Sequence, residues 1–282
     1  MKKVLVTGGT GFIGSNLIKK LLKLDFRLTS LDNNSTGNKK NEFRGVEYIQ
    51  DDIVNIETLY NDYDICFHLA AQSRVQPSFV DPEESFRVNV YGTKKIMEWA
   101  KDNNTKIIYA GSSSKHHNPS DSPYAMYKFL GEEVCKLYRK SFKVKVQIAR
   151  FYNVYGPGEN VDEVNGNVIG IWRSKIANGE PLPIVGDGNQ KRDFVHVYDI
   201  VDGLIKIGLS ELHHDDAWEL GTGINYSINE VFDYFKNKFD AKSINIPDQP
   251  GNYRETLREN DDTIKLLNWM PKDRLKEHIN KL

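Results

Sequence analysis

The sequence predicts an α/β protein in which a doubly wound parallel sheet is followed by a smaller, mixed α/β lobe. Short apolar runs alternate with amphipathic helical patterns through the first half of the 282-residue chain. The runs show little polar alternation, which is typical of parallel strands covered on both faces. After Arg150 the pattern loosens, and glycine and proline gather in the segments YGPGEN and GEPLPIVGDGNQ. We expect loops there, so the regular sheet should lie mainly in the first half.

Strands and helices alternate in the first half. The strands are expected at Lys3–Thr7, Leu28–Leu31, Val46–Ile49, Asp64–Leu69, Lys106–Ala110 and Val144–Arg150. The helices between them are expected at Phe12–Leu24, Ser85–Lys101 and Tyr124–Lys140. Because connections between parallel strands are right-handed, these helices should cover both faces of the sheet.

The second half is expected to carry helices separated by loops. The helical patterns lie at Val168–Asn178, Tyr198–Leu209, Ile228–Phe239 and Thr263–Leu267. We expect residues 1–153 to form the first domain. Residues 154–282 should form mainly the smaller lobe, with parts of 154–220 returning to the first domain.

Composition excludes several classes of protein. Hydrophobic residues make up 39% and charged residues 27%, with a formal net charge of −1, so nothing indicates a nucleic-acid or acidic-membrane partner. The N-terminal apolar run stops at Gly8, too early for a signal-peptide core, and no apolar segment is long enough to span a membrane. A cytoplasmic protein is expected. Cys66 and Cys135 lie in apolar or helical patterns typical of buried thiols, and no residues have metal-ligand spacing.

Three glycines stand between the first strand and the first helix. Gly8, Gly11 and Gly14 occur in T-G-G-T-G-F-I-G. Glycine in such a turn allows a tight bend and a close backbone approach to a pyrophosphate, which the following helix N-terminus attracts. Asp32 follows the second strand, where a carboxylate can accept hydrogen bonds from both ribose hydroxyls and would repel a 2′-phosphate. The pattern indicates a Rossmann-type dinucleotide site and favours NAD over NADP.

The even spacing of these glycines resembles that of the extended short-chain dehydrogenase/reductase family. Asp51-Asp52-Ile53 resembles the family's adenine-binding step, and His68-Leu69-Ala70-Ala71-Gln72 resembles the element below the nicotinamide. Asn89 matches a conserved position of the family on the next helix. The resemblance extends from Lys3 to about Trp269, nearly the whole chain.

The resemblance implies that NAD is the cofactor. Asp52 is expected to face the adenine amino group and Tyr152 the nicotinamide amide. The full set of expected cofactor-binding residues is Gly8, Gly11, Phe12, Ile13, Gly14, Asp32, Asn33, Ser35, Thr36, Gly37, Asp52, Ile53, Leu69, Ala70, Ala71, Gln72, Asn89, Tyr124, Lys128 and Tyr152.

Tyr124 and Lys128 form the pattern Y-x-x-x-K at the start of a long predicted helix. Residues four apart share a helix face, so the ammonium should lie near the phenol. The ammonium and an oxidised nicotinamide would both favour the phenolate, so we expect the pKa of Tyr124 to fall from about 10 toward neutrality. Tyr124 could then act as a general base. The resemblance adds Ser112, at the end of the fifth strand, as the hydroxyl that binds the reacting sugar oxygen.

The two residues after Ser112 bear on the type of reaction. Dehydratases of the family carry an Asp-Glu pair there, whereas this chain has Ser113 and Ser114, so dehydration is not expected. The family's V-Y-G is replaced by Lys115-His116-His117, and a short loop follows. His116 and His117 are either pocket residues or exposed loop histidines.

The second half contains segments that resemble the family's nucleotide-sugar lobe. R-F-Y-N-V-Y-G-P contains Asn153, expected at the sugar diphosphate, and G-D-G-N-Q-K-R-D-F contains Arg192, expected to clamp the diphosphate. Arg254 fits the second arginine of a closing segment, and Gln249 stands where the first arginine is usual, so Arg254 or Arg258 should carry more of that charge. The expected substrate-binding residues are Ser73, Ser112, Ser113, Ser114, Tyr124, Asn153, Val168, Arg192, Arg254 and Thr256.

The resemblance implies epimerisation of a nucleotide-diphosphate sugar at C4 through a transient 4-keto sugar. A UDP-hexose or a UDP-N-acetylhexosamine is expected as the substrate. Thr256 falls at a position that gates the sugar's C2 substituent, and its small side chain leaves room for an N-acetyl group, so UDP-N-acetylglucosamine and its galacto epimer should be accepted alongside or in preference to UDP-glucose. The alternatives are other 4-keto chemistry, in a reductase or a decarboxylase, and a non-catalytic NAD sensor. A homodimer is expected through the helices at Ser85–Lys101 and Tyr124–Lys140.

Overall fold

The computed structural model describes residues 1–59 and 62–282. Within these ranges seven strands form one sheet in the order β10-β6-β5-β4-β1-β2-β3, and every neighbouring pair is parallel. The strands are β1 (Lys2–Thr7), β2 (Phe26–Leu31), β3 (Val46–Ile49), β4 (Ile65–His68), β5 (Lys106–Ser112), β6 (Val146–Phe151) and β10 (Trp218–Leu220). The predicted fold class is confirmed.

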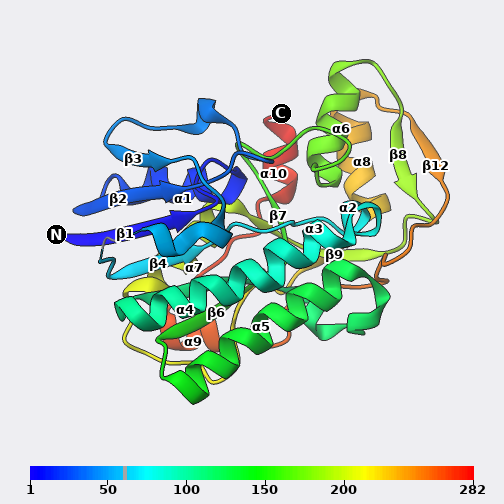
Figure 1. Cartoon of the computed structure of the whole chain (residues 1–282). Helices are drawn as coiled ribbons and strands as arrows, with labels where there is room; N and C mark the ends of the chain where they lie inside the picture. Colours follow the sequence, from blue (N-terminus) through cyan, green and yellow to red (C-terminus); the bar gives the residue numbers. More distant parts are fainter. Residues whose placement is uncertain (60–61) are drawn as a thin grey trace.

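Helices cover both faces of this sheet (Figure 1). One face packs against α1 (Phe12–Leu21) and α7 (Val197–Leu209), and the other against α4 (Thr93–Asn103) and α5 (Pro123–Phe142). Alternate residues of a strand serve opposite faces: Val4 and Val6 lie in the first core and Leu5 in the second. The sheet is therefore buried between two apolar layers, as its uninterrupted apolar runs predicted.

The sequence analysis missed the seventh strand, β10, which pairs with β6. This strand has three residues, and the middle one is Glu219, a charged side chain that is 0% exposed. Neither an apolar run nor an alternating pattern marks such a segment. β10 is part of the main sheet, and α7 packs on one of its faces. The domain boundary after residue 153 stays a prediction.

The smaller lobe contains two further sheets. β7 (Asn153–Tyr155), β9 (Lys191–His196) and β11 (Asn225–Ser227) form one, and β8 (Leu182–Val185) pairs with β12 (Ser243–Ile246) in the other. The helices of the lobe are α6 (Val168–Ala177), α8 (Ile228–Phe239) and α10 (Leu275–Asn280). Trp172 is fully buried in their common core and packs edge-on against Phe232 and Phe235. The sequence analysis predicted α6 and α8 but not these short strands.

Local capping explains where two helices begin. Before α4, the chain forms α2 (Val75–Val80), α3 (Pro82–Phe86) and a π-helical turn η3 (Arg87–Gly92). This helical region starts before the expected Ser85, because Asp81 caps α3 by accepting from the Glu84 N–H and Pro82 occupies the first turn. Ser122 likewise caps α5, with its hydroxyl accepting from Ala125 N at 3.1 Å.

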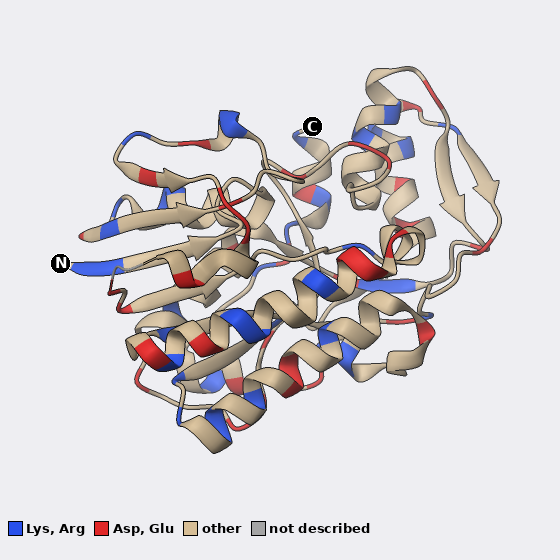
Figure 2. Cartoon of the chain, viewed as in Figure 1, with Lys and Arg blue, Asp and Glu red and all other residues tan. Residues whose placement is uncertain are grey.

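The remaining elements are short. They are α9 (Asp262–Leu267) and the 3₁₀ turns η1 (Lys39–Asn41), η2 (Ile53–Thr58), η4 (Ser113–His116) and η5 (Pro119–Asp121). Cys66 and Cys135 are buried free thiols, as expected. Basic and acidic residues are interspersed along α4 and α5 (Figure 2). No helix in the described ranges combines the length and apolarity that crossing a membrane requires.

Candidate functional site

A cavity of about 930 Å³ lies where the carboxyl ends of the central strands meet the smaller lobe. This is where ligands bind in open α/β sheets. The structure brings most of the predicted residues together there: the lining includes Gly8, Gly11, Phe12, Ile13, Gly14, Asp32, Asn33, Ser35, Thr36, Asp52, Ile53, Leu69, Ala70, Ala71, Gln72, Ser73, Ser112, Ser113, Ser114, Tyr124, Lys128, Tyr152, Asn153, Val168, Arg192 and Thr256. Gly37, Asn89 and Arg254 do not line it.

The glycine-rich turn joins β1 to α1 in the geometry that a phosphate site needs. Gly8 has φ +73°, a conformation that favours glycine, and a Cβ on Gly14 would lie 2.1 Å from the Gly8 carbonyl oxygen. Gly11 is the N-cap of α1 and offers no side chain to the first-turn N–H groups. These donors at the rim of the cavity fit the pyrophosphate of a dinucleotide.

Asp32 connects the loop after β2 to the glycine-rich turn. Its Oδ2 accepts from Thr10 N at 2.9 Å, and its Oδ1 accepts from Asn34 N at 2.8 Å. A carboxylate has about four acceptor positions, so ribose hydroxyls can still be bound. Gly37 packs behind this carboxylate, because a Cβ there would lie 3.2 Å from Asp32 Oδ2.

Asp52 is held by a residue that the sequence analysis did not select. Arg87 Nη2 donates to Asp52 Oδ2 at 2.8 Å, and Asn33 Nδ2 donates to the same oxygen at 3.1 Å. Burial opposes ionisation, but these bonds outweigh it and lower the pKa of Asp52. Asp52 is therefore an ionised acceptor at the wall of the cavity, and its expected contact with the adenine stays a prediction. Arg87 lies two residues before Asn89, but a lone arginine on a helix carries no distinctive signal.

Asn89 supports the loop after β4 rather than contacting the cavity. Its Oδ1 accepts from Gln72 N, and its Nδ2 donates to Gln72 O, both at 2.9 Å. Because Asn89 is 1% exposed, its expected direct cofactor contact is corrected to an indirect one. His68 is also structural: it contacts Thr7 Oγ1 at 2.8 Å, and burial lowers its pKa to about 3, so it is uncharged.

Ser112 and Tyr124 meet inside the cavity. The Tyr124 hydroxyl donates to Ser112 Oγ at 3.3 Å, and the Ser114 hydroxyl donates to the same oxygen at 2.9 Å. Tyr124 lies in the first turn of α5, where its N–H donates to Ser78 Oγ at 3.0 Å. The Tyr124 phenol and the Ser112 hydroxyl are thus close enough for both to contact one substrate oxygen.

The pKa of Tyr124 is raised in the chain without a bound cofactor, so the expected fall is not found there. Burial is the largest influence and raises the pKa, while the bond to Ser112 and the charge of Arg74 lower it. The Lys128 ammonium donates to the Ala110 carbonyl oxygen instead and lies 4.6 Å from the ring centre of Tyr109. Burial lowers the pKa of Lys128 to about 8.

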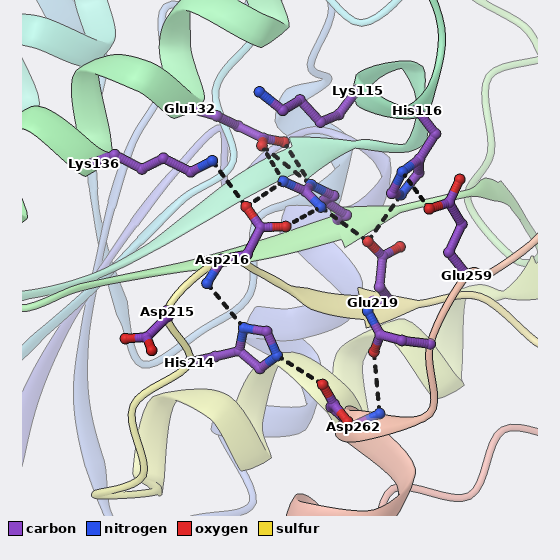
Figure 3. A network of polar contacts seen from close by, with 12 residues as sticks. Lys115, His116, Glu132, Lys136, His214, Asp215, Asp216, Glu219, Glu259 and Asp262 are labelled. Carbon is purple, nitrogen blue, oxygen red and sulfur yellow. Dashed lines mark hydrogen bonds and ion pairs between the residues drawn. The ribbon is translucent and has the colours of Figure 1, made fainter.

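An ionic network that sequence reasoning missed joins side chains from several elements (Figure 3). Arg150 on β6 donates to Glu132 on α5 at 2.8 Å, to Asp216 at 2.6 Å and to Glu219 on β10 at 3.1 Å. Glu132 Oε1 also accepts from Ser112 N at 3.4 Å. No local pattern could reveal this network, because its members lie on separate elements and meet only in the fold.

Glu219 extends the network to the edge of the cavity. Tyr152 donates to Glu219 Oε2 at 2.6 Å, and His116 Nε2 lies 2.9 Å from Glu219 Oε1. His116 Nδ1 lies 3.1 Å from Glu259. His116 and His117 line a neighbouring cavity of about 440 Å³ and do not line the main one, so their role at the sugar pocket stays a prediction.

The substrate-lobe arginines differ in position. Arg192 lines the cavity, and its Nη2 donates to Asn252 Oδ1 at 2.6 Å. Burial lowers the pKa of Arg192 to about 10, so it remains a cation at neutral pH. Arg254 is 71% exposed and pairs with Asp187 at 3.1 Å outside the cavity, so its placement among the substrate-binding residues is corrected. Arg258 lines the second cavity instead.

Thr256 is a buried residue shared by the two cavities. Its Oγ1 accepts from Asn153 Nδ2 and from Asp193 N, each at 3.2 Å. Gln249 also lines the main cavity, as do Arg74 and Tyr253, which sequence reasoning did not select. Arg74 directly follows Ser73, so its position in the loop after β4 was the available signal. Across the described residues, no group of three or more potential metal ligands gathers.

A family model described as "NAD dependent epimerase/dehydratase family" matches residues 4–221. The UDP-glucose 4-epimerase of Mycolicibacterium smegmatis is 30% identical over 310 residues, covering 99% of this chain and 96% of that protein. Relatives of comparable similarity include UDP-glucuronic acid decarboxylases.

Two solved structures are similar over almost the whole chain. The UDP-N-acetylglucosamine 4-epimerase of Methanobrevibacter ruminantium, solved with UDP-N-acetylmuramic acid, has a TM-score of 0.90 and 28% identity, with 99% of this chain and 96% of that chain covered. A UDP-glucuronic acid 4-epimerase mutant of Bacillus cereus, solved with a substrate analogue and NAD, has a TM-score of 0.91 and 26% identity, with the same coverage. This chain therefore belongs to the NAD dependent epimerase/dehydratase family and is an enzyme that modifies nucleotide sugars with NAD as its cofactor.

Proposed function

We propose that the enzyme epimerises a nucleotide-diphosphate sugar at C4 through a transient 4-keto sugar. The observation that carries this proposal is the 3.3 Å hydrogen bond between Tyr124 Oη and Ser112 Oγ at the wall of the cavity. The residues around the glycine-rich turn would hold NAD, which would supply reversible hydride acceptance at C4. The residues of the chain then have to bind the sugar, move one proton and keep the reacting oxygen in place.

Tyr124 is the proposed proton acceptor. It takes the proton of the sugar 4-hydroxyl while Ser112 donates its own hydroxyl to the same oxygen, and the proton returns when the ketone is reduced. The buried Lys128 is the proposed cation behind this pair, since its pKa of about 8 keeps it mostly charged at neutral pH. Ionising a buried phenol is costly, so the positive charges at this end of the cavity support the phenolate.

Dehydration lacks a suitable acid. Among the described residues, the acidic side chains that line the cavity are Asp32, Asp52, Glu163 and Glu180. None of them hydrogen-bonds to Ser112 or Tyr124, and the residues after Ser112 are hydroxyls. We therefore do not propose dehydration, which needs an acid and a base at the sugar.

The remaining contacts are proposed for the nucleotide sugar. Arg192 is proposed to bind the diphosphate, because it is a partly buried cation in the cavity with no acidic partner within 4.0 Å among the described residues. Thr256 is proposed to leave room for a C2 acetamido group. The relatives named above act on UDP-glucose, UDP-N-acetylglucosamine and UDP-glucuronic acid, so we propose a UDP-sugar.

The test is to incubate the purified enzyme with UDP-, GDP- and dTDP-sugars and to follow the products by NMR without added NAD. We expect an equilibrium mixture of C4 epimers, with NAD rather than NADP released when the protein is denatured. Loss of a carbon as CO₂ would indicate decarboxylation instead. A requirement for stoichiometric external cofactor would identify a reductase, and absence of any turnover would favour an NAD sensor.

A further inference from the structure

Arg74 is a cation in the cavity that the proposed mechanism does not use. It lies at the start of α2 and lines the cavity. Its Nε donates to the Asn165 carbonyl oxygen at 2.8 Å, which fixes the guanidinium between α2 and the loop before α6. Over residues 1–59 and 62–282, neither Nη atom has a hydrogen-bond acceptor and no carboxylate lies within 4.0 Å. The outer edge of the guanidinium is therefore free to bind a ligand.

Glu159 and Asp162 are the carboxylates whose charges influence Arg74, and both already have other hydrogen-bond partners. Glu159 accepts from Arg173 at 3.1 Å and from Asn167 at 3.0 Å. Asp162 accepts from the N–H groups of residues 164 and 165 at 3.0 and 2.7 Å. Neither carboxylate forms an ion pair with Arg74 in the described part of the chain, and both are held by these other bonds.

The other positively charged side chains that line the cavity have a partner or a proposed role. Lys175 pairs with Glu163 and Glu180, and Lys128 donates to a backbone carbonyl. Arg192 is proposed for the diphosphate. In the described part of the cavity, Arg74 is thus a partly buried cation without a counter-charge. Such a cation is costly unless the ligand supplies an anion.

The local structure connects the helix that follows Arg74 to the helix that carries Tyr124. Ser78, one helical turn after Arg74, accepts from Tyr124 N at 3.0 Å and donates to Val75 O at 2.6 Å. The start of α2 is therefore attached to the first turn of α5, which carries Tyr124. The positive charge of Arg74 acts on Tyr124 and lowers its pKa, which agrees with this connection between the two helices.

We propose that Arg74 binds a carboxylate on the substrate's sugar, so that the enzyme prefers a nucleotide-diphosphate uronic acid to the corresponding neutral hexose. The proposal rests on the proposed function, because it takes C4 as the reacting carbon. The C5 carboxylate of a uronic acid is adjacent to C4, and a guanidinium edge matches a carboxylate with two parallel hydrogen bonds. The same edge could bind the diphosphate instead, and the experiment must separate these two anions.

The experiment measures the affinities of UDP, UDP-glucose and UDP-glucuronic acid by calorimetry. The proteins compared are the NAD-loaded wild type, Arg74→Gln and Arg74→Lys. We expect the wild type to bind UDP-glucuronic acid at least about 10-fold more tightly than UDP-glucose, the usual scale of a charge-assisted pair. Arg74→Gln should abolish this preference and leave UDP binding within about 3-fold, while Arg74→Lys should retain part of it.

A matched control is Arg192→Gln, which should weaken all three ligands to a similar extent. Equal wild-type affinities for UDP-glucuronic acid and UDP-glucose would overturn the proposal, even if the variants failed to fold. Equal losses for all three ligands in Arg74→Gln would assign Arg74 to the diphosphate and also overturn it. Because the measured quantity is affinity and not product formation, a uronic-acid preference would stand even if no C4 epimer were formed, and then only the proposed function would fail.

Discussion

At the scale of single residues, Tyr124 is hydrogen-bonded to Ser112, whereas Lys128 is bonded elsewhere. Ser112 Oγ accepts from both Tyr124 and Ser114, while Lys128 is bound to the Ala110 carbonyl. The phenol is therefore oriented by the serine, and the lysine contributes charge from a buried position. Tyr124 is therefore the residue whose replacement tests the proposed chemistry most directly.

Replacing Tyr124 by phenylalanine removes the proposed base and keeps the ring. We expect turnover to fall by at least about 10²-fold, the usual contribution of general acid–base catalysis. NAD content should be unchanged, because the substitution leaves the glycine-rich turn and Asp32 as they are. Turnover is followed by NMR, and NAD is quantified after denaturation. Near-normal turnover would contradict the assignment.

His116 is a residue whose charge can be titrated. Burial alone would lower its pKa, but the hydrogen bond and charge of Glu219, together with the charge of Glu259, raise it despite the opposing charge of Arg150. A histidine with a raised pKa stabilises the fold fully below its unfolded value of about 6.5. That stabilisation is lost as the pH rises through the folded value.

The corresponding variant is His116→Gln, compared with the wild type by thermal unfolding at pH 5.5 and 8.5. The deficit in Tm should be larger at pH 5.5 than at pH 8.5. His213→Gln is the control, because burial lowers the pKa of His213 and should not stabilise the fold at low pH. A deficit that is the same at both pH values would show that the His116 charge is not involved.

At the scale of elements, β6, α5 and β10 are joined by ionic bonds in the interior. Arg150 and Glu132 are 2% and 1% exposed, so neither is screened by water. A buried ion pair contributes little net stability, but removing one partner leaves the other charged and desolvated. Removing either Arg150 or Glu132 should therefore lower the free energy of unfolding.

For Arg150→Met we expect a loss of about 3–5 kcal/mol in the free energy of unfolding, measured by urea denaturation. The matched control is Arg254→Met, which breaks an exposed ion pair with Asp187 and should cost no more than about 1 kcal/mol. Similar losses in the two variants would mean that the buried network is not a critical element of the fold.

At the scale of the whole molecule, one surface carries more exposed apolar side chains than a monomer needs. Phe86 on α3 and Tyr91 on η3 are 44% and 45% exposed, and Leu137 and Phe142 on α5 are 53% and 50% exposed. Phe86 packs edge-on against Tyr127 of α5, so α3 and α5 form one surface. We expect this surface to pair with a second copy of the chain.

The test is Leu137→Glu, examined by analytical ultracentrifugation. The wild type should sediment as a dimer and the variant as a monomer, because a charge at an apolar contact would be buried without a partner. The control is Leu209→Glu on α7, which is also exposed and lies on the opposite face of the sheet. A monomeric wild type, or a dimeric Leu137→Glu, would reject the dimer surface.

Local signals account for what could be predicted. The glycine-rich turn, the Y-x-x-x-K pair and Ser112 after a buried strand each depend on neighbours within one or two elements. The boundaries of β3 and α8 were predicted to the residue because their apolar periodicity is strong. The three-residue β10 could not be recognised, since a strand that short has no period.

The sequence by itself determined the parallel sheet, the cofactor and most of the side chains around the cavity, because periodicity and motif spacing are local properties of the chain. Only the tertiary structure decided which charges meet. It joined Arg150 to Glu132 and Glu219, moved Arg254 out of the cavity and left Arg74 inside it without a counter-charge. Electrostatic pairing depends on distance in space and on burial, and neither quantity exists until the separate elements pack together.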